Sequence, residues 1–339
     1  MTMYPWQQAA WTQLQQMRER LPHAILFHGP AGTGKADFLE TFAQSLLCEN
    51  VRPDGHACGE CASCGWFVQH NHPDYRRVRP EALEDEPAPD GEEGGEGKAR
   101  STKAPSKDIK IEQIRALADF MNISTHRQGL RVVVLYPAEA LNMPASNALL
   151  KTLEEPPPGT VFLLASNSLD RLLPTILSRC RKFALPMPAH GEALAWLKEQ
   201  GVADADSWLR EQGGAPLAAL AEAEGGSREE MEALLHFLAR PSTDGALRTA
   251  EKLAKAELPA LVAWTQRWLY DVFSYKLSGN IRYFPRYQKE LAALAGRVHT
   301  ASLMRAIKGT SERRAVADHP LSAKLFVEDM LLEYTSCCT

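Results

Sequence analysis

A glycine-rich loop between an apolar run and a helical pattern is the feature that most constrains this fold. Residues 24–29, "AILFHG", are apolar and end at a glycine, and Gly29, Gly34 and Lys35 stand at the spacing of a phosphate-binding loop. A helical pattern then continues through Leu47. Because such a loop needs a strand before it and a helix after it, we expect a strand, a phosphate loop and a helix in that order.

Two further apolar runs have the character of buried strands. "RVVVLY" at 131–136 and "VFLLAS" at 161–166 are continuous, contain β-branched residues and are bounded by turn residues, as parallel strands covered on both faces are. Between them, residues 145–159 place leucines on one helical face and stop at three consecutive prolines, which cannot continue a helix. The first 185 or so residues therefore predict an α/β layer structure.

The second half of the chain reads as helical. Beyond Pro186 the strand signals fade and helical periodicity takes over, with a "GG" break at 225–226. In residues 258–277 four large apolar side chains recur at steps of three and four: Leu261, Trp264, Trp268 and Val272. They share one helical face, for which core packing and a subunit interface are both possible roles.

Residues 84–107 predict a disordered insert. They contain seven acidic residues by position 96, many glycines and prolines, and nothing aromatic. A solvated loop and a regulatory or partner-binding tail are the two readings of this segment.

The overall charge argues against unaided nucleic-acid binding. Lysine plus arginine number 38 against 42 aspartates plus glutamates, so any grip on DNA must be local or shared with a partner. No apolar stretch approaches the roughly 20 residues that span a bilayer, and the first 16 residues are polar and amphipathic, unlike a signal sequence. We expect a cytoplasmic protein with no membrane contact.

A cysteine cluster follows the helix of the loop, with gaps of nine, two and two residues: Cys48, Cys58, Cys61 and Cys64. Two-residue gaps aim paired thiolates at one tetrahedral ion, and a complete sulfur shell leaves no position for water, so we expect structural Zn²⁺. Unliganded thiols and an iron–sulfur cluster are the alternatives, and His56 and His70 are nearby substitute ligands. Cys180 is expected in the core, and Cys337 and Cys338 in a frayed tail.

The nucleotide site is incomplete. Ala36 stands where a Ser or Thr hydroxyl would hold Mg²⁺, and Tyr136 and Pro137 stand where an Asp and a Glu would hold the metal and activate water. Glu139 lies two places too far along. We therefore expect no hydrolysis at this site. Weak or absent nucleotide binding is expected at the loop residues Gly29, Gly32, Thr33, Gly34 and Lys35, whose backbone N–H groups at a helix N-terminus still favour an anion.

Taken together, these motifs resemble the bacterial clamp loader family, the AAA+ ATPase subunits of the DNA polymerase III holoenzyme. The matching segments are the loop at 29–35, the cysteines, "HNHPDY" at 70–75, "SNALLKTLEEPP" at 146–157 and "LPTILSRC" at 173–180. Within the family the chain is most similar to the delta prime branch, because the gamma and tau motor subunits keep the metal ligands that this chain lacks.

The resemblance implies three domains. These are a RecA-like AAA+ domain at 1–185 with a zinc module at 48–64, a small helical lid at 186–224 and an all-α collar for oligomerisation at 225–339. Active members carry a nucleotide-sensing arginine in the lid, but the corresponding region here has Ala215, Pro216 and Leu217. This departure also speaks against ATP-driven motion in this subunit.

The resemblance also assigns a role to the Ser-Arg-Cys motif, which maps onto Ser178, Arg179 and Cys180. In the family its arginine is a finger for ATP bound by the neighbouring subunit, and a permanently charged guanidinium suits the charge that develops on a transferring phosphoryl group. The implied partners are gamma or tau, delta, and, through the complex, the sliding β clamp and primed DNA.

The sequence thus predicts a catalytically inert delta prime subunit within a nucleotidyltransferase complex, a hetero-oligomer for DNA replication. One alternative is an active gamma- or tau-like ATPase that uses Glu139 as an unconventional metal ligand. Another is a zinc-dependent nucleic-acid-binding module without ring partners, which the acidic balance disfavours.

Overall fold

The strand before the phosphate loop lies inside a parallel sheet. The computed structural model describes residues 3–84, 105–122, 129–317 and 322–338. Five strands pair in the order β2-β3-β4-β1-β5, and every pair is parallel. Their bounds are β1 Ala24–His28, β2 Tyr75–Val78, β3 Arg131–Leu135, β4 Thr160–Ser166 and β5 Arg181–Ala184. The parallel α/β sheet expected from the sequence is confirmed.

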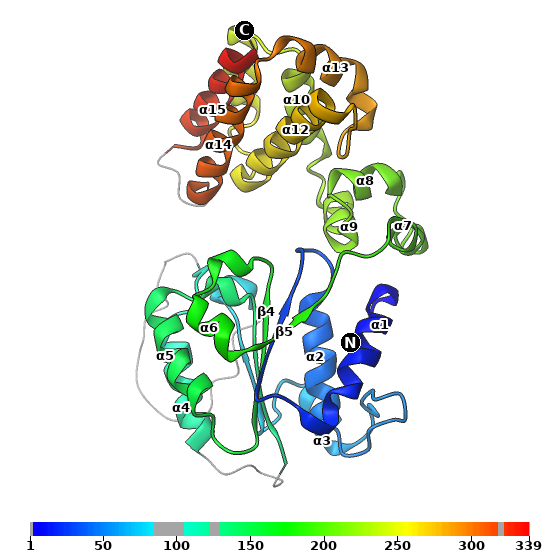
Figure 1. Cartoon of the computed structure of the whole chain (residues 1–339), viewed down its shortest axis with the longest axis vertical. Helices are drawn as coiled ribbons and strands as arrows, with labels where there is room; N and C mark the ends of the chain where they lie inside the picture. The colour runs from blue at the N-terminus through cyan, green and yellow to red at the C-terminus, as the bar shows by residue number, and fades with distance from the viewer. Residues whose placement is uncertain (1–2, 85–104, 123–128, 318–321, 339) are drawn as a thin grey trace. The chain divides into compact units, whose positions relative to one another are not determined.

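Helices cover both faces of this sheet (Figure 1). One face packs against α1 Gln8–Gln16, α2 Lys35–Leu47 and α3 Ala62–Val68, and the other against α4 Ile111–Asn122, α5 Met143–Glu154 and α6 Pro174–Arg179. Successive strand residues alternate between the two cores: Ile25 and Phe27 join the first, and Ala24 and Leu26 join the second. Because both faces are covered, the central strands are apolar at nearly every position.

The predicted strands at 24–29, 131–136 and 161–166 and the helix ending at the prolines are all present within a residue or two. The edge strands β2 and β5 were not predicted. The disordered insert predicted for 84–107 falls mainly on residues 85–104, which lie outside the described residues.

The chain divides into two compact units, Met1–Pro188 and Ala189–Thr339. The second unit is helical throughout its described residues. Its helices are α7 His190–Glu199, α8 Ala205–Glu211, α9 Pro216–Gly225, α10 Arg228–Ala239, α11 Thr243–Lys252, α12 Leu258–Ser278, α13 Gln288–Arg297, α14 Thr300–Val316 and α15 Ala323–Cys338.

Six short 3-10 helices complete the described elements: η1 Pro5–Gln7, η2 Arg18–Arg20, η3 Glu81–Leu83, η4 Ala138–Ala140, η5 Leu169–Arg171 and η6 Pro285–Tyr287. None of the helices among the described residues combines the length and apolar character needed to cross a membrane.

The aromatic face of α12 lies in the core of the second unit. Leu261, Trp264, Trp268 and Val272 are each at most 1% exposed, so core packing is confirmed for this face. The indole Nε1 of Trp268 donates to the Tyr334 hydroxyl at 2.9 Å, and that hydroxyl donates to a backbone carbonyl of α10 at 2.8 Å. Three helices are therefore joined through one buried pair of aromatic side chains.

The expected boundary between lid and collar, after residue 224, lies inside this second unit. It lies within a residue of the end of α9, where Gly226 has a φ of +73° and caps the helix. The division of the second unit into lid and collar stays a prediction.

The expectation of a frayed tail at Cys337 and Cys338 was wrong. Both residues belong to the last turn of α15 and pack against the core of the second unit, because the helix carries its apolar face to the end. Cys180 is 8% exposed and lies in the core, as predicted.

Candidate functional site

The four clustered cysteines bring their sulfur atoms together. The Sγ of Cys48 lies 3.5 Å from that of Cys58 and 3.9 Å from that of Cys61, and Cys58 lies 3.9 Å from Cys64. All four sulfurs fall within 4.8 Å of one another. Tetrahedral zinc with Zn–S bonds of about 2.3 Å needs sulfur separations of about 3.8 Å, whereas a disulfide needs about 2 Å. The side chains thus fit one ion of the zinc type.

Local backbone geometry aims these sulfurs. Cys48 directly follows α2, and Cys61 is the N-cap of α3, where its sulfur accepts from the Cys64 N–H at 3.4 Å. The Cys58 sulfur accepts from the N–H groups of Glu60 at 3.4 Å and Cys61 at 3.3 Å. These bonds lower the pKa of Cys58 to about 6, which favours the thiolate that a metal binds.

The two histidines considered as substitute ligands lie outside the cluster. The His56 ring stacks on Trp11 with centroids 4.3 Å apart, and His70 belongs to no metal-binding group of the described residues. His72, which the sequence did not single out, is buried. Its Nδ1 accepts from the Asp74 N–H at 3.1 Å, so Nε2 carries the proton and donates to the Ser63 hydroxyl at 2.8 Å. This bond joins α3 to the start of β2.

Two glycines of the phosphate loop lie close to other parts of the chain. A Cβ at Gly29 would lie 1.9 Å from the carbonyl oxygen of Leu185, and one at Gly34, where φ is +78°, would lie 2.3 Å from the ring of Tyr4. Glycine is therefore required at both positions by the folded chain itself. Lys35 is only 6% exposed, and its Nζ donates to the carbonyl of Pro30 inside the loop.

Burial lowers the pKa of Lys35 to about 8, and the nearby charge of Glu139 opposes that shift. The ammonium of Lys35 is thus hydrogen-bonded within the loop itself. Thr33, another predicted loop residue, also turns inward, because its hydroxyl donates to the Pro30 carbonyl at 3.0 Å. Gly32 has a φ of +73° at the tip of the loop.

The N-terminal segment packs on the loop, which sequence reasoning did not predict. Gln7 Nε2 donates to the carbonyls of Thr33 at 3.1 Å and Gly34 at 2.8 Å, and Trp6 Nε1 donates to Thr33 at 3.0 Å. The hydroxyl of Tyr4 donates to an Asp37 carboxylate oxygen at 3.0 Å, and its ring stacks on Trp6 with centroids 5.0 Å apart. These contacts fix the loop in the conformation described.

The positions at which an active ATPase would hold magnesium and activate water have other side chains here. Ala36 has no hydroxyl, and the Tyr136 hydroxyl lies 3.4 Å from a carboxylate oxygen of Glu40, a buried residue of α2. Glu139, the rival metal ligand, accepts from the Asn167 N–H at 3.0 and 3.2 Å. Among the described residues, only the four cysteines form a group of three or more side chains suited to a metal.

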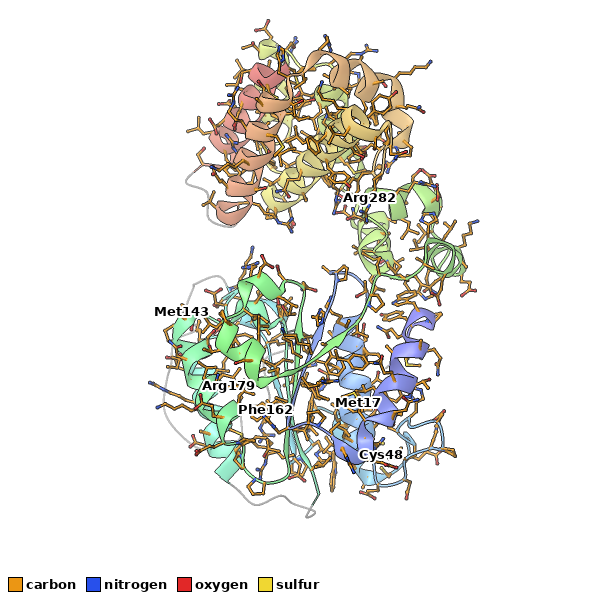
Figure 2. All side chains as sticks on the ribbon, in the orientation of Figure 1. Met17, Cys48, Met143, Phe162, Arg179 and Arg282 are labelled. Atoms are coloured by element: carbon orange, nitrogen blue, oxygen red, sulfur yellow. The ribbon has the colours of Figure 1, made fainter. Side chains whose placement is uncertain are left out.

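Arg179 is the last residue of α6, on the opposite side of the sheet from Cys48 (Figure 2). Its side chain is 30% exposed, pairs with Glu154 through Nη2, and donates through Nη1 to the Thr175 carbonyl at 2.9 Å. Ser178 is exposed and Cys180 is buried, so Arg179 is the one charged member of the motif at the surface.

Comparison with known proteins gives this arrangement a family. Over residues 6–189 the chain matches the family model described as DNA polymerase III, delta subunit. It is 36% identical to DNA polymerase III subunit delta' of Pseudomonas aeruginosa, over 81% of this chain and 79% of that protein. It is 32% identical to the Escherichia coli protein of the same name, over 80% and 76%.

A solved structure of a DNA polymerase III gamma subunit-related protein from Thermotoga maritima aligns with 97% of this chain and 99% of its own, at 18% identity and a TM-score of 0.44. The family match covers the whole sheet, the cysteine cluster, the phosphate loop and Arg179. The chain therefore belongs to the family of DNA polymerase III subunits whose members carry the name delta prime.

Proposed function

We propose that this chain is the inert delta prime subunit of a bacterial clamp loader, a hetero-oligomer with gamma or tau and delta subunits. It supplies Arg179 to ATP bound by a neighbouring gamma or tau subunit, and so helps the complex place the sliding β clamp on primed DNA. The observation that carries the proposal is a partly exposed arginine at the end of α6 in a chain whose own P-loop lysine is buried and bonded to the loop.

Inertness is supported by the chemistry missing around Lys35. Hydrolysis on a P-loop requires a metal held by a hydroxyl and an acid, and a group that orients water. Ala36 and Pro137 carry no such groups, and the carboxylate of Glu139 is bonded to the backbone at Asn167. The loss of all three functions raises the barrier more than any one neighbour can restore.

The finger role is supported by charge and position. The Arg179 guanidinium keeps its charge at every physiological pH and presents several N–H donors in a plane. Such a group stabilises the negative charge that spreads over the γ-phosphate oxygens in the transition state. Its surface position at a helix end suits a contact made across a subunit boundary.

We propose a structural role for zinc at Cys48, Cys58, Cys61 and Cys64. Four thiolates complete the shell of one ion, so no coordination position is left for a reacting water molecule. The ion would tie the end of α2 to the start of α3.

Arg179→Ala tests the proposed function in a reconstituted complex with gamma or tau and delta subunits. We expect normal assembly and a fall of about 100-fold or more in ATP turnover at the neighbouring site. The DNA-stimulated ATP hydrolysis of the whole complex should therefore fall by at least the contribution of that one site. Arg181→Ala is the matched control, because Arg181 is also exposed and lies two residues away on β5. Unchanged hydrolysis in Arg179→Ala would remove the finger role.

The isolated chain should show no Mg²⁺-dependent ATP turnover above a Lys35→Ala variant. Appreciable turnover that Lys35→Ala abolishes would favour the autonomous ATPase instead.

A further inference from the structure

The contacts of Arg179 single out one residue outside the Ser-Arg-Cys motif. The guanidinium pairs through Nη2 with the Glu154 carboxylate, and through Nη1 with the Thr175 carbonyl at 2.9 Å and the Ser178 hydroxyl at 3.5 Å. Thr175 and Ser178 belong to the same helix as the arginine, whereas Glu154 is the last residue of α5. Glu154 is thus the contact that fixes the side chain with respect to a second element.

Helix electrostatics place this carboxylate in an unfavourable position by itself. The C-terminal end of a helix carries partial negative charge, so a glutamate there is repelled, whereas an arginine beside it is attracted. Glu154 is the last residue of α5, and the Arg179 guanidinium reaches it from the end of α6. The arginine therefore relieves a local excess of negative charge.

Packing of α5 on α6 does not depend on this ion pair. Leu149 and Leu153 of α5 and Ile176 of α6 are each at most 1% exposed and lie in one apolar core. The ion pair is at the surface, with the Glu154 side chain 49% exposed. Ion pairs with this exposure contribute little to stability. The pair can still fix the orientation of the Arg179 side chain.

We propose that Glu154 is a positioning residue that holds the Arg179 guanidinium in place before it meets the nucleotide of the neighbouring subunit. The inference rests on the proposed function. A free arginine side chain samples many rotamers and loses this freedom when it docks. The pair with Glu154 removes part of that loss before docking, as preorganised catalytic groups require.

Glu154 need not release the arginine for the finger to act. A guanidinium has five N–H donors, and the hydrogen bonds of Arg179 use one donor of Nη2 and at most two of Nη1. Within the described part of the chain, no hydrogen bond from Nε is present. A phosphate oxygen can therefore be contacted through the remaining donors, so Glu154 assists the finger and does not compete with the phosphate.

The test compares the full-length wild type, Glu154→Gln and Glu155→Gln. Glu155 is the matched control, because it is the next residue, exposed, and in no ion pair among the described residues. In the isolated chain, side-chain NMR of labelled arginine, assigned with Arg179→Lys, should show a restricted Arg179 in wild type and Glu155→Gln. In Glu154→Gln we expect a mobile Arg179 side chain with thermal unfolding close to wild type.

In the reconstituted complex, Glu154→Gln should lower the kcat of DNA-stimulated ATP hydrolysis about two- to five-fold and leave the KM for ATP unchanged, the range typical of an exposed ion pair. A kcat equal to that of Glu155→Gln, or higher than wild type, would overturn the inference while leaving the finger role intact. If Arg179→Ala has no effect on kcat, the proposed function is contradicted. A restricted Arg179 side chain would then report only a structural contact, so the positioning role would be overturned as well.

Discussion

At the scale of single residues, two cations of this chain have opposite surroundings. Lys35 is buried and bonded to the loop that should present it to a phosphate, whereas the Arg179 side chain is 30% exposed and held at its guanidinium by Glu154. The pKa of a lysine falls readily on burial, whereas an arginine keeps its charge. Arg179 therefore presents a permanent positive charge. The two cations therefore differ in their access to solvent, which is the difference on which the proposed roles of Lys35 and Arg179 rest.

Lys35→Met should stabilise the chain at neutral pH. Burial lowers the folded-state pKa of Lys35 from 10.5 to about 8, so between these values the folded state binds fewer protons than the unfolded state and stability rises with pH. At pH 7 the full cost of burying the charge is present, on the order of 1–3 kcal/mol, and Met removes it.

The measurement is urea unfolding of both proteins from pH 7 to 10.5. The free energy of unfolding of the wild type should rise toward that of Lys35→Met as the pH increases above 8. The difference between the two proteins should become constant near pH 10.5. A difference that is constant over this range would show that Lys35 keeps its ordinary pKa in the folded protein.

At the scale of elements, one buried carboxylate joins three parts of the second unit. Glu211 at the end of α8 is 2% exposed and pairs with Arg228 of α10 at 2.8 Å and Arg286 of η6 at 3.1 Å. Arg228 also lies over the ring of Trp208, 4.6 Å from its centroid. Although burial raises the pKa of Glu211, both arginines oppose that shift. The helices expected as lid and collar are thus linked by charge as well as by apolar contacts.

Glu211→Ala should destabilise the second unit by about 2–4 kcal/mol, because it leaves two arginines without their shared buried partner. Glu229→Ala is the control, since this exposed glutamate of α10 makes no ion pair within the described residues. Urea unfolding followed by circular dichroism compares the variants. A loss below about 0.5 kcal/mol would mean that water replaces the carboxylate at no cost.

At the scale of the whole molecule, the two compact units have separate apolar cores. The sheet of Met1–Pro188 has one core on each face, and Ala189–Thr339 has a core of its own. Each unit therefore has its own source of stability, and a local change in one need not reach the other.

Cys61→Ser or a strong zinc chelator should affect the first unit alone. We expect about one zinc per chain in wild type and almost none in the variant by elemental analysis, since a thiolate of the shell is lost. Hydrogen exchange should then speed up in α3 and the end of α2, with α12 unchanged. The control is Cys337→Ser, because Cys337 is a free cysteine of the second unit. This variant should bind as much zinc as the wild type. Full zinc retention in Cys61→Ser would contradict the assigned shell.

Sequence reasoning succeeded where burial is complete and failed at the edges of the sheet. The central strands β1, β3 and β4 are apolar because helices cover both faces. The edge strands β2, "YRRV", and β5, "RKFA", have one neighbour each and carry charged side chains at exposed positions, so their sequences lack the apolar run that identifies a buried strand. The cysteine cluster was predictable because its ligands lie close together in sequence.

The sequence by itself determined the order of strand, loop and helix and the set of four thiols, since each of these depends on residue types at short spacing. Only the tertiary structure decided what lies on the loop and what holds Arg179. The contacts of Tyr4, Trp6 and Gln7 with the loop, and of Glu154 with the arginine, join residues about 25 or more positions apart. Local patterns carry no signal for such contacts, because they are set by how the helices pack on the sheet.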